Sequence, residues 1–336
     1  MRELEHFAAW VEAGYAGEME YLKGRSESGE YKRSSLEQAL PWAKSVIVAA
    51  MNYNTAVPRS IEPSEPTEGW ISRYALSPRD YHDIVLGALK RVESVLSEDI
   101  RVSGGEAATR CYVDTGPVIE RVYAKYAGLG WVGKNTCLID QRLGSWFFLG
   151  VIVTSLDLSA FATDAKLNIA SDRCGSCTRC IDACPTDAIL APRQLDASRC
   201  IAYFTIEKRG EIAEDFRSDI GRHVFGCDIC QDVCPWNRKA PVTRNPDFQP
   251  DPRLVNPDLS ELARISPQEF RERFRGSPIA RAKHSGFLRN VAIAMGNSGC
   301  SEYSTDLETM MESGDPTLAE HARWAISRLK ELSSPR

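Results

Sequence analysis

The sequence lacks any hydrophobic run long enough to cross a bilayer. Its longest apolar stretch, residues 146–156, is too short for a membrane helix and contains Gly150 and Thr154, so it predicts a buried strand. The first 21 residues also lack the basic start and apolar centre of an export signal, and they contain no twin arginine. We therefore expect a cytoplasmic protein with no membrane segment.

The sequence also lacks an excess of positive charge. The 336 residues carry a net charge of -5, which argues against a protein that binds nucleic acid through general basicity. A local basic patch is still compatible with this balance. The length allows about two or three domains with a substantial core. The composition, with 43% hydrophobic and 26% charged residues, is ordinary for a soluble globular protein.

Cysteine, in contrast, is concentrated in one stretch. Eight of the eleven cysteines lie between residues 174 and 234. The first four have the C-x2-C-x2-C-x3-C-P spacing of a bacterial 4Fe-4S site; they are Cys174, Cys177, Cys180 and Cys184. The second run is incomplete and consists of Cys227, Cys230 and Cys234. Val224 stands where its first cysteine would be, and Cys200 can fill that vacancy.

These spacings predict two clusters whose ligands are crossed. In two-cluster ferredoxins the last cysteine of each run binds the other cluster, because three close thiolates cap only one face of a cube. One cluster should be held by Cys174, Cys177, Cys180 and Cys234, and the other by Cys184, Cys200, Cys227 and Cys230. The alternatives are zinc, whose ribbon sites use longer gaps, and disulfides, which require an oxidising compartment. Small buried residues are expected at Cys111, Cys137 and Cys300.

The segment before the cysteines predicts a mixed α/β domain over residues 1–165. An apolar, β-branched run predicts a strand at 45–53, and further strands are predicted at 109–113, 136–139 and 146–154. Helices are predicted at 4–22, 77–96 and 118–127, with Ser77 as the N-cap of the second and Pro78 at its first position. Asp114 follows a strand and precedes a Gly-Pro turn, a position where an acid is more often a cap or turn residue than a catalyst.

Residues 128–133 match the GxGxxG string of dinucleotide-binding folds. The context does not fit, because this string follows a helix and runs toward a strand. A phosphate loop would need Ser or Thr after Lys134, where Asn135 stands. The glycine-rich loop with Lys134, Asn135 and Thr136 is instead suited to contact a large polar cofactor.

The rest of the chain predicts two further domains. A ferredoxin-like domain with two 4Fe-4S clusters should cover residues 166–245, and a proline-rich linker follows it. Helices at 267–275, 279–295 and 318–332 predict a helical, HEAT-like domain over residues 246–336. Six arginines and one lysine between 264 and 290 form either a solvated face or a patch that contacts phosphates.

Two adjacent clusters can transfer electrons one at a time, and these electrons need an acceptor. The chain could be an electron carrier, an RNA-binding scaffold with redox-inert clusters, or a reductase whose N-terminal domain holds a second cofactor and the substrate. The loops of that domain favour the reductase. The residues alone do not name its cofactor.

Four blocks in order carry a resemblance to a known family. They are 73–82, 113–121 (VDTGPVIER), 128–136 (GLGWVGKNT) and the cysteine runs. Together they closely resemble the epoxyqueuosine reductases over nearly the whole chain. The resemblance implies a cobalamin-dependent enzyme that reduces epoxyqueuosine to queuosine at the wobble position of tRNA, the last step of queuosine biosynthesis. Reductive dehalogenases share a similar cobalamin fold and are the main alternative, but their respiratory members carry the twin-arginine signal that is absent here.

The resemblance also implies roles for individual residues. Base-off cobalamin would bind between the N-terminal and cluster domains, and Asp114 matches the family's proton donor. That role requires a protonated carboxyl group, which burial beside the corrin would favour. The expected cofactor contacts are Arg73, Tyr81, Asp114, Lys134, Asn135, Thr136, Cys227 and Asp228.

The substrate implied by the resemblance is a tRNA that carries epoxyqueuosine. Its anticodon stem-loop would dock on basic residues of the tail and the cluster domain, in a stretch running from Arg264 to Arg289. The expected tRNA contacts are Lys208, Arg209, Arg271, Arg273, Arg275, Arg281 and Lys283. A donor such as a flavodoxin or ferredoxin would supply electrons, and we expect a monomer.

Overall fold

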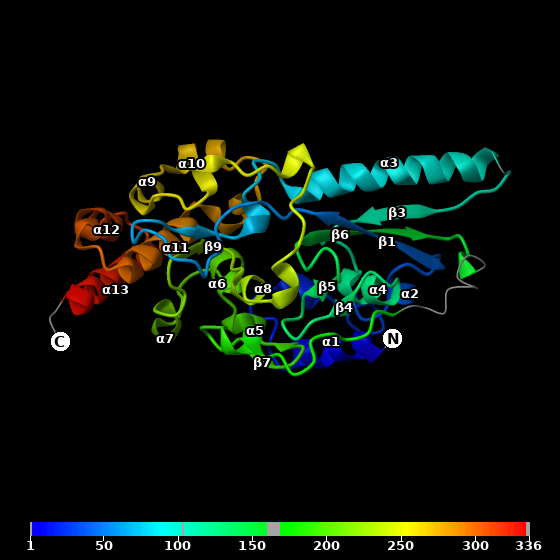
Figure 1. The fold of residues 1–336 in the computed structure, drawn as a ribbon, viewed down its shortest axis with the longest axis horizontal. Coiled ribbons are helices and arrows are strands. Elements are labelled where there is room, and N and C mark those ends of the chain that lie inside the picture. The colour runs from blue at the N-terminus through cyan, green and yellow to red at the C-terminus, as the bar shows by residue number, and fades with distance from the viewer. Residues whose placement is uncertain (1, 103, 160–168, 334–336) are drawn as a thin grey trace.

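The structure, a computed structural model, describes residues 2–102, 104–159 and 169–333 and combines α and β elements (Figure 1). Its main sheet has the order β1-β6-β3, with bounds Ser45–Asn52, Phe147–Thr154 and Thr109–Tyr112. The central strand β6 pairs antiparallel with both neighbours and is buried along nearly its whole length. Three of the predicted strands, at 45–53, 109–113 and 146–154, therefore form this sheet.

Helices cover both faces of this sheet. Their bounds are Leu36–Ala39 for α2, Tyr81–Val102 for α3 and Glu120–Tyr126 for α4. Side chains alternate along a strand, so Phe148 and Ile152 of β6 pack with α3, whereas Val151 and Val153 pack with α2. Gly150 also faces α3, where an added Cβ would lie 2.8 Å from Leu89 Cδ1. The missing side chain at Gly150 lets the helix lie close to the sheet.

The N-terminal segment reaches across to the cysteine-rich part of the chain. Helix α1 spans Arg2–Glu12 and is shorter than predicted, because Gly14 adopts a φ of 79° and ends it. The indole N–H of Trp10 donates to the carbonyl of Leu195 at 2.6 Å, and the amide of Glu18 donates to the Tyr203 hydroxyl at 2.9 Å. Short 3-10 helix η1, Glu20–Leu22, follows.

The cysteine-rich segment consists of short elements joined by loops. Its helices are α5 (Arg179–Asp182), α6 (Ile201–Ile206), α7 (Glu214–Arg217) and α8 (Ile229–Asp232). Its strands are β7 (Ile189–Ala191), β8 (Gln194–Leu195) and β9 (His223–Phe225). Strand β9 pairs in parallel with β2, Trp70–Ile71, which comes from the N-terminal half. This pairing joins two segments that the sequence assigns to different domains.

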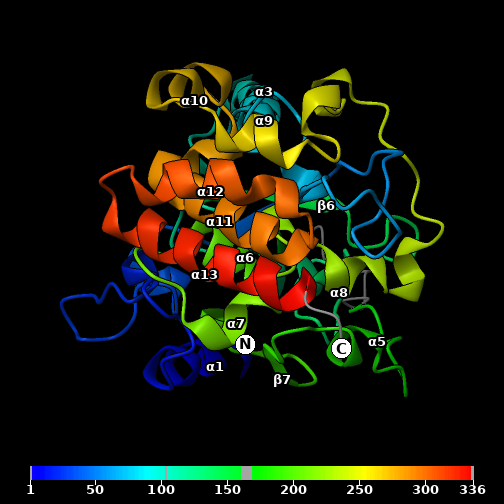
Figure 2. The same cartoon turned by 90° about the vertical axis from the view of Figure 1, so that its left-hand side faces the viewer.

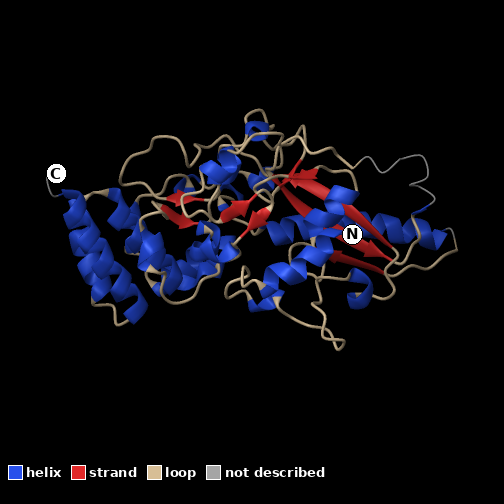
Figure 3. Ribbon diagram, turned by 90° about the horizontal axis from the view of Figure 1, so that it is seen from below, coloured by secondary structure: helices blue, strands red, loops and turns tan. Residues whose placement is uncertain are grey.

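The C-terminal tail is helical, as predicted. Its helices are α9 (Leu259–Ala263), α10 (Pro267–Arg273), α11 (Lys283–Ser298), α12 (Ser304–Met311) and α13 (Pro316–Ser333). Helices α11, α12 and α13 stack side by side (Figure 2). One hydrophobic core runs from these helices to Ile71 and Phe225, so the tail packs directly on the β2–β9 pair. The three-stranded sheet lies at the opposite end of the molecule from α13 (Figure 3).

Some predicted boundaries are wrong. Helix α3 starts at Tyr81 rather than near Ser77, because the carboxylate of Asp80 accepts the amide of His82 and caps it, and it continues to Val102. The predicted strand at 136–139 is reduced to β5, Leu138–Ile139, which pairs with β4, Trp131–Val132. The boundary at 165 between the first two predicted domains lies outside the described residues. No helix in the described ranges is long and apolar enough to cross a membrane.

Candidate functional site

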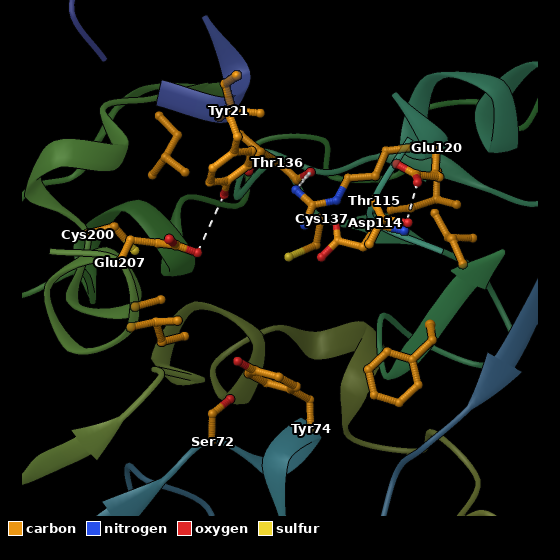
Figure 4. Close-up of a pocket in the computed structure, with 18 of the residues that line it drawn as sticks. Tyr21, Ser72, Tyr74, Asp114, Thr115, Glu120, Thr136, Cys137, Cys200 and Glu207 are labelled. Carbon is orange, nitrogen blue, oxygen red and sulfur yellow. Dashed lines mark hydrogen bonds between the residues drawn. The ribbon is translucent and has the colours of Figure 1, made fainter. Parts of the chain in front are cut away.

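A cavity of about 1370 Å³ lies between the sheet and the cysteine-rich segment. Its wall on the sheet side includes the start of α3, the loop after β3, strand β6 and the loop at 133–138. The cysteine-rich segment contributes the loops near 184–189, 200–202 and 227–231. Asp114, Thr136, Cys137 and Cys200 all border this space (Figure 4). The volume exceeds the roughly 300–1,000 Å³ of ordinary small-molecule pockets, so the cavity can accept a large cofactor.

Aromatic rings form one wall of the cavity. Tyr81 stacks on Phe148 with 4.3 Å between ring centroids and 3° between planes, and Tyr74 meets Tyr81 edge-on at 5.8 Å. Burial raises the pKa of Tyr74 and, together with the charge of Asp114, that of Tyr81. Both phenols therefore stay protonated near neutral pH and can donate hydrogen bonds.

Asp114 lies on the loop between β3 and α4. Its φ of 55° is left-handed, which Asp tolerates better than most residues. The Tyr81 hydroxyl donates to Asp114 Oδ2 at 2.8 Å, and the Asp114 amide donates to Glu120 Oε1 at 2.9 Å. The side chain of Asp114 is exposed toward the cavity, so the protein residues alone do not provide the burial expected for a proton donor. Burial instead raises the pKa of Glu120.

One group of cysteines lies behind the cavity. Burial and the nearby thiols of Cys234, Cys174 and Cys177 raise the pKa of Cys180 to about 11. Cys174 and Cys234 also pack with Trp131 and Ile139, and none of the four cysteines borders the cavity. The four residues that crossed ligation predicts for one cluster are thus neighbours in space.

A second group of cysteines borders the cavity. Burial and the nearby thiols of Cys200 and Cys184 raise the pKa of Cys227, while Cys230 is a further neighbour. All four line the cavity wall. Among the described residues, no three His, Cys, Asp or Glu side chains are arranged to hold a single metal ion. The thiols of a cubane site each bind a different iron, so they need not converge on one point.

The loop at 133–138 anchors the sheet side to this second group. The side-chain amide of Asn135 donates to the Cys230 carbonyl at 3.2 Å. Thr136 lines the cavity, and its backbone φ is 64°. The Lys134 ammonium donates to the Gly175 carbonyl at 2.7 Å and does not line the cavity. Of the three predicted contacts on this loop, Asn135 and Thr136 line the cavity, while the Lys134 side chain turns toward the first cysteine run.

Arg73 also lies away from the cavity wall. Its side chain is buried, donates to Asn54 Oδ1 at 3.2 Å and lies 4.8 Å from the Trp146 ring centroid. Its backbone amide donates to Asp228 Oδ2 at 2.6 Å. Asp228 lines the cavity as expected, but the structure gives Arg73 the role of holding Asp228 rather than touching a ligand.

Three of the predicted basic residues lie at the cavity, namely Arg209, Arg281 and Lys283. Arg281 donates to Asp80 Oδ2 at 2.7 Å, and its guanidinium lies 5.5 Å from the Tyr81 ring centroid. Lys208 is paired with Glu18 beside the cavity. Arg271 and Arg275 are exposed at α10 and the turn after it, and Arg273 donates to the Arg253 carbonyl at 3.3 Å.

The two ends of the predicted basic stretch differ in exposure. Arg289 is 1% exposed and donates to the carbonyls of Lys208, Gly210 and Phe204, so it is part of the core. Arg264 forms an ion pair with Asp306 at 2.9 Å. Arg289 therefore cannot be part of a phosphate-contacting stretch, whereas the exposed Arg264 stays a predicted contact.

Comparison with known proteins identifies the family. The family model "Epoxyqueuosine reductase QueG, DUF1730" matches residues 33–115, and the model "4Fe-4S double cluster binding domain" matches residues 173–237. The epoxyqueuosine reductase of Xanthomonas campestris is 40% identical over 96% of this chain and 88% of its own length. That of Pseudomonas aeruginosa is also 40% identical, over 96% of this chain and 86% of its own length.

The chain belongs to the epoxyqueuosine reductase family. It is therefore a reductase with a double 4Fe-4S cluster binding domain, which sets the electron-carrier and scaffold alternatives aside. The resemblance in the four sequence blocks is confirmed.

Solved epoxyqueuosine reductases share this fold. One, in complex with a stem loop of epoxyqueuosine-modified tRNA-Tyr, has a TM-score of 0.84 and 30% identity, covering 98% of this chain and 83% of its own. The Bacillus subtilis enzyme, solved with a catalytic aspartate loop swung out of its active site, has a TM-score of 0.83, 28% identity and the same coverage.

Several residues of the site have no local sequence signal. Glu120 lies in the 113–121 block but carries no assigned role there, and its contact with the Asp114 amide needs the folded loop. Phe148 belongs to a strand whose sequence predicts burial but indicates no role in a site. Cys137 is expected to be a small buried residue, yet it lines the cavity. A hydrogen bond between the thiols lowers the pKa of Cys137 and raises that of Cys230.

Proposed function

We propose that this epoxyqueuosine reductase converts epoxyqueuosine to queuosine at the wobble position of tRNA in the cytoplasm, as the last step of queuosine biosynthesis. The observation that carries the proposal is a large cavity bordered both by the second cysteine group and by Asp114. Family membership and a relative solved with an epoxyqueuosine-modified stem loop support this substrate.

Two 4Fe-4S clusters would deliver the electrons. The first would bind Cys174, Cys177, Cys180 and Cys234, and the second would bind Cys184, Cys200, Cys227 and Cys230. The spatial grouping of the thiols supports these ligand sets. Because only the second group borders the cavity, electrons from a donor such as a flavodoxin or ferredoxin would pass from the first cluster to the second.

The cavity residues fit base-off cobalamin as the resident cofactor. The volume of about 1370 Å³, the aromatic wall and the polar Thr136 and Asp228 suit a large, amide-rich macrocycle. When bound, cobalamin supplies a cobalt centre that takes electrons one at a time and delivers them to the epoxide carbon. Thr136, Tyr81 and Asp228 would contact its edge, and Cys227 would keep the second cluster close to it.

Asp114 would donate one of the two protons with which the epoxide oxygen leaves as water, solvent would supply the other, and the two electrons would come through the clusters. Its carboxyl group faces the cavity, and the Tyr81 hydroxyl fixes one of its oxygens at 2.8 Å. The carboxyl group is therefore the chain's own contribution to bond cleavage.

The modified base must leave its stack to reach the cavity. Arg209, Arg281 and Lys283 at the cavity rim would receive the backbone phosphates next to the flipped nucleotide. Exposed Arg271 and Arg275, with Arg273 beside them, would contact the anticodon stem farther out. Lys208 would add positive potential near the rim. A local patch of this kind suits selective docking by an acidic protein.

Anaerobic reconstitution tests this function. The protein is loaded with iron, sulfide and cobalamin, reduced, and incubated with epoxyqueuosine tRNA, and the released nucleosides are measured by mass spectrometry. We expect queuosine to form, and we expect Asp114→Asn to lose about 100-fold or more in kcat while keeping cobalamin and both clusters. Asp83→Asn is the matched control, because Asp83 is an exposed acid of α3.

Two results would count against the proposal in different ways. Normal turnover by a fully loaded Asp114→Asn variant would remove Asp114 from the role of acid. A fully loaded, reduced wild-type protein that leaves epoxyqueuosine tRNA unchanged would overturn the assigned reaction.

A further inference from the structure

The backbone of Asp114 is held in a conformation that needs support. A left-handed φ of 55° at a residue other than glycine persists where the surroundings over-determine it. The loop also folds tightly on the strand before it, because a Cβ added at Gly116 would lie 2.3 Å from Tyr112 Cδ1. The contacts that fix this loop therefore decide where the carboxyl group of Asp114 points.

Glu120 makes the backbone contact. Its Oε1 accepts the Asp114 amide at 2.9 Å (Figure 4), and its side chain is buried. Glu120 is the first residue of α4, whose Val122 and Ala124 are buried against the sheet side. A buried side chain on a packed helix gives the loop an acceptor oxygen in a fixed position.

Tyr81 makes the side-chain contact from the other side. Its hydroxyl donates to Asp114 Oδ2, and its ring is stacked on Phe148 of β6. Asp114 is thus held at two points by residues of two different helices, α3 and α4. In the Bacillus subtilis relative, a catalytic aspartate loop was captured swung out of the active site, so such a loop has a second position in that protein.

We propose that Glu120 is the positioning residue of this active site, whose carboxylate holds the Asp114 loop in the docked position through the Asp114 amide. The inference rests on the proposed function of Asp114 as the acid. Glu120 also lines the cavity, and its assignment as a positioning residue rests on its contact with the Asp114 amide. Loss of its acceptor frees the loop, and the acid then spends most of its time away from the reacting oxygen.

The test compares three variants of the fully loaded protein. Glu120→Ala removes the acceptor, Glu120→Gln keeps an oxygen at the same position and nearly the same volume, and Glu308→Ala is the control at an exposed glutamate of α12. Two quantities are measured, namely hydrogen exchange of the peptide covering 113–119, and kcat and KM for epoxyqueuosine tRNA.

We expect Glu120→Ala to exchange faster at 113–119 and to lose about tenfold or more in kcat with KM unchanged. Glu120→Gln should restore both readouts to within about threefold of the wild type, since an amide oxygen still accepts the Asp114 N–H. Glu308→Ala should match the wild type. Cobalamin and iron content should be equal in all four proteins.

Unchanged exchange at 113–119 in Glu120→Ala would overturn the inference, whatever the activity. Equal losses in Glu120→Ala and Glu120→Gln would also overturn it, because charge rather than the acceptor oxygen would then matter. If Glu120→Ala frees the loop while Asp114→Asn turns over normally, the proposed acid fails and the loop anchor stands. The exchange readout thus separates the two failures.

Discussion

At the scale of single residues, the orientation of Asp114 depends on the phenol of Tyr81. Tyr81 has two separate functions, because its ring packs on Phe148 while its hydroxyl reaches the Asp114 carboxylate. Burial and the charge of Asp114 raise the pKa of Tyr81, so the phenol keeps its proton and its hydroxyl is the donor to Asp114 Oδ2. A substitution that removes the oxygen alone can therefore separate packing from orientation.

Tyr81→Phe should lower kcat about fivefold to tenfold, because one hydrogen bond to the carboxylate is lost while the stacked ring remains. Cobalamin content and the midpoint of thermal unfolding should stay close to those of the wild type. The measurement is steady-state turnover of epoxyqueuosine tRNA beside the absorbance spectrum of the loaded protein. A variant with wild-type kcat would show that Tyr81 does not orient the acid.

At the scale of elements, the sequence predicts strands and long helices well and loops poorly. The runs that form β1 and β6 are apolar and rich in β-branched residues, and this pattern predicts strands. The start of α3 is misplaced because Ser77 and Asp80 are both good caps, and the fold selects Asp80. Helix α12 has a short, weakly amphipathic sequence and gives no clear prediction.

Gly150 shows how one strand position controls a helix contact. Gly150→Ala should reduce the free energy of unfolding by about 1–3 kcal/mol, because its Cβ would overlap Leu89 and Val85 of α3. Gly87→Ala, on α3 itself, is the matched control. Its added Cβ would meet only Arg91 Nη1 at 3.9 Å, so it should stabilise the helix by about 0.5–1 kcal/mol. Denaturant unfolding of the wild type, the two single variants and the double variant measures both changes in the free energy of unfolding. Equal changes in the two single variants would contradict the packing argument.

At the scale of the whole molecule, the active site is assembled from segments that are distant in the sequence. The cysteine spacing alone predicts which thiols are neighbours, since cluster geometry constrains it. The positions of Glu120, Phe148 and Arg281 around one cavity follow only from the packing of the sheet, the cysteine-rich segment and the tail. The same holds for Lys134 and Arg73, whose residue types suit a cofactor contact but whose side chains bind protein carbonyls.

His321 of the tail contacts the cysteine-rich segment and makes the stability of the fold depend on pH. Its Nδ1–H can donate to the Thr317 carbonyl at 2.7 Å while Nε2 accepts the Ile212 amide at 3.1 Å, an arrangement that only the neutral ring satisfies. Burial lowers the pKa of His321 to about 4, from 6.5. The unfolded chain therefore binds a proton first as the pH falls, and the stability due to His321, complete above about pH 6.5, is lost progressively toward pH 4.

Between pH 7.5 and 5.5 the loss in the free energy of unfolding due to His321 should be about 1 kcal/mol. His321→Gln, which offers an amide oxygen to the Ile212 N–H and does not titrate, should show a pH dependence of unfolding that is smaller by this amount. Parallel denaturant titrations of both proteins at the two pH values measure the difference, and identical pH dependences would mean that His321 does not carry this linkage.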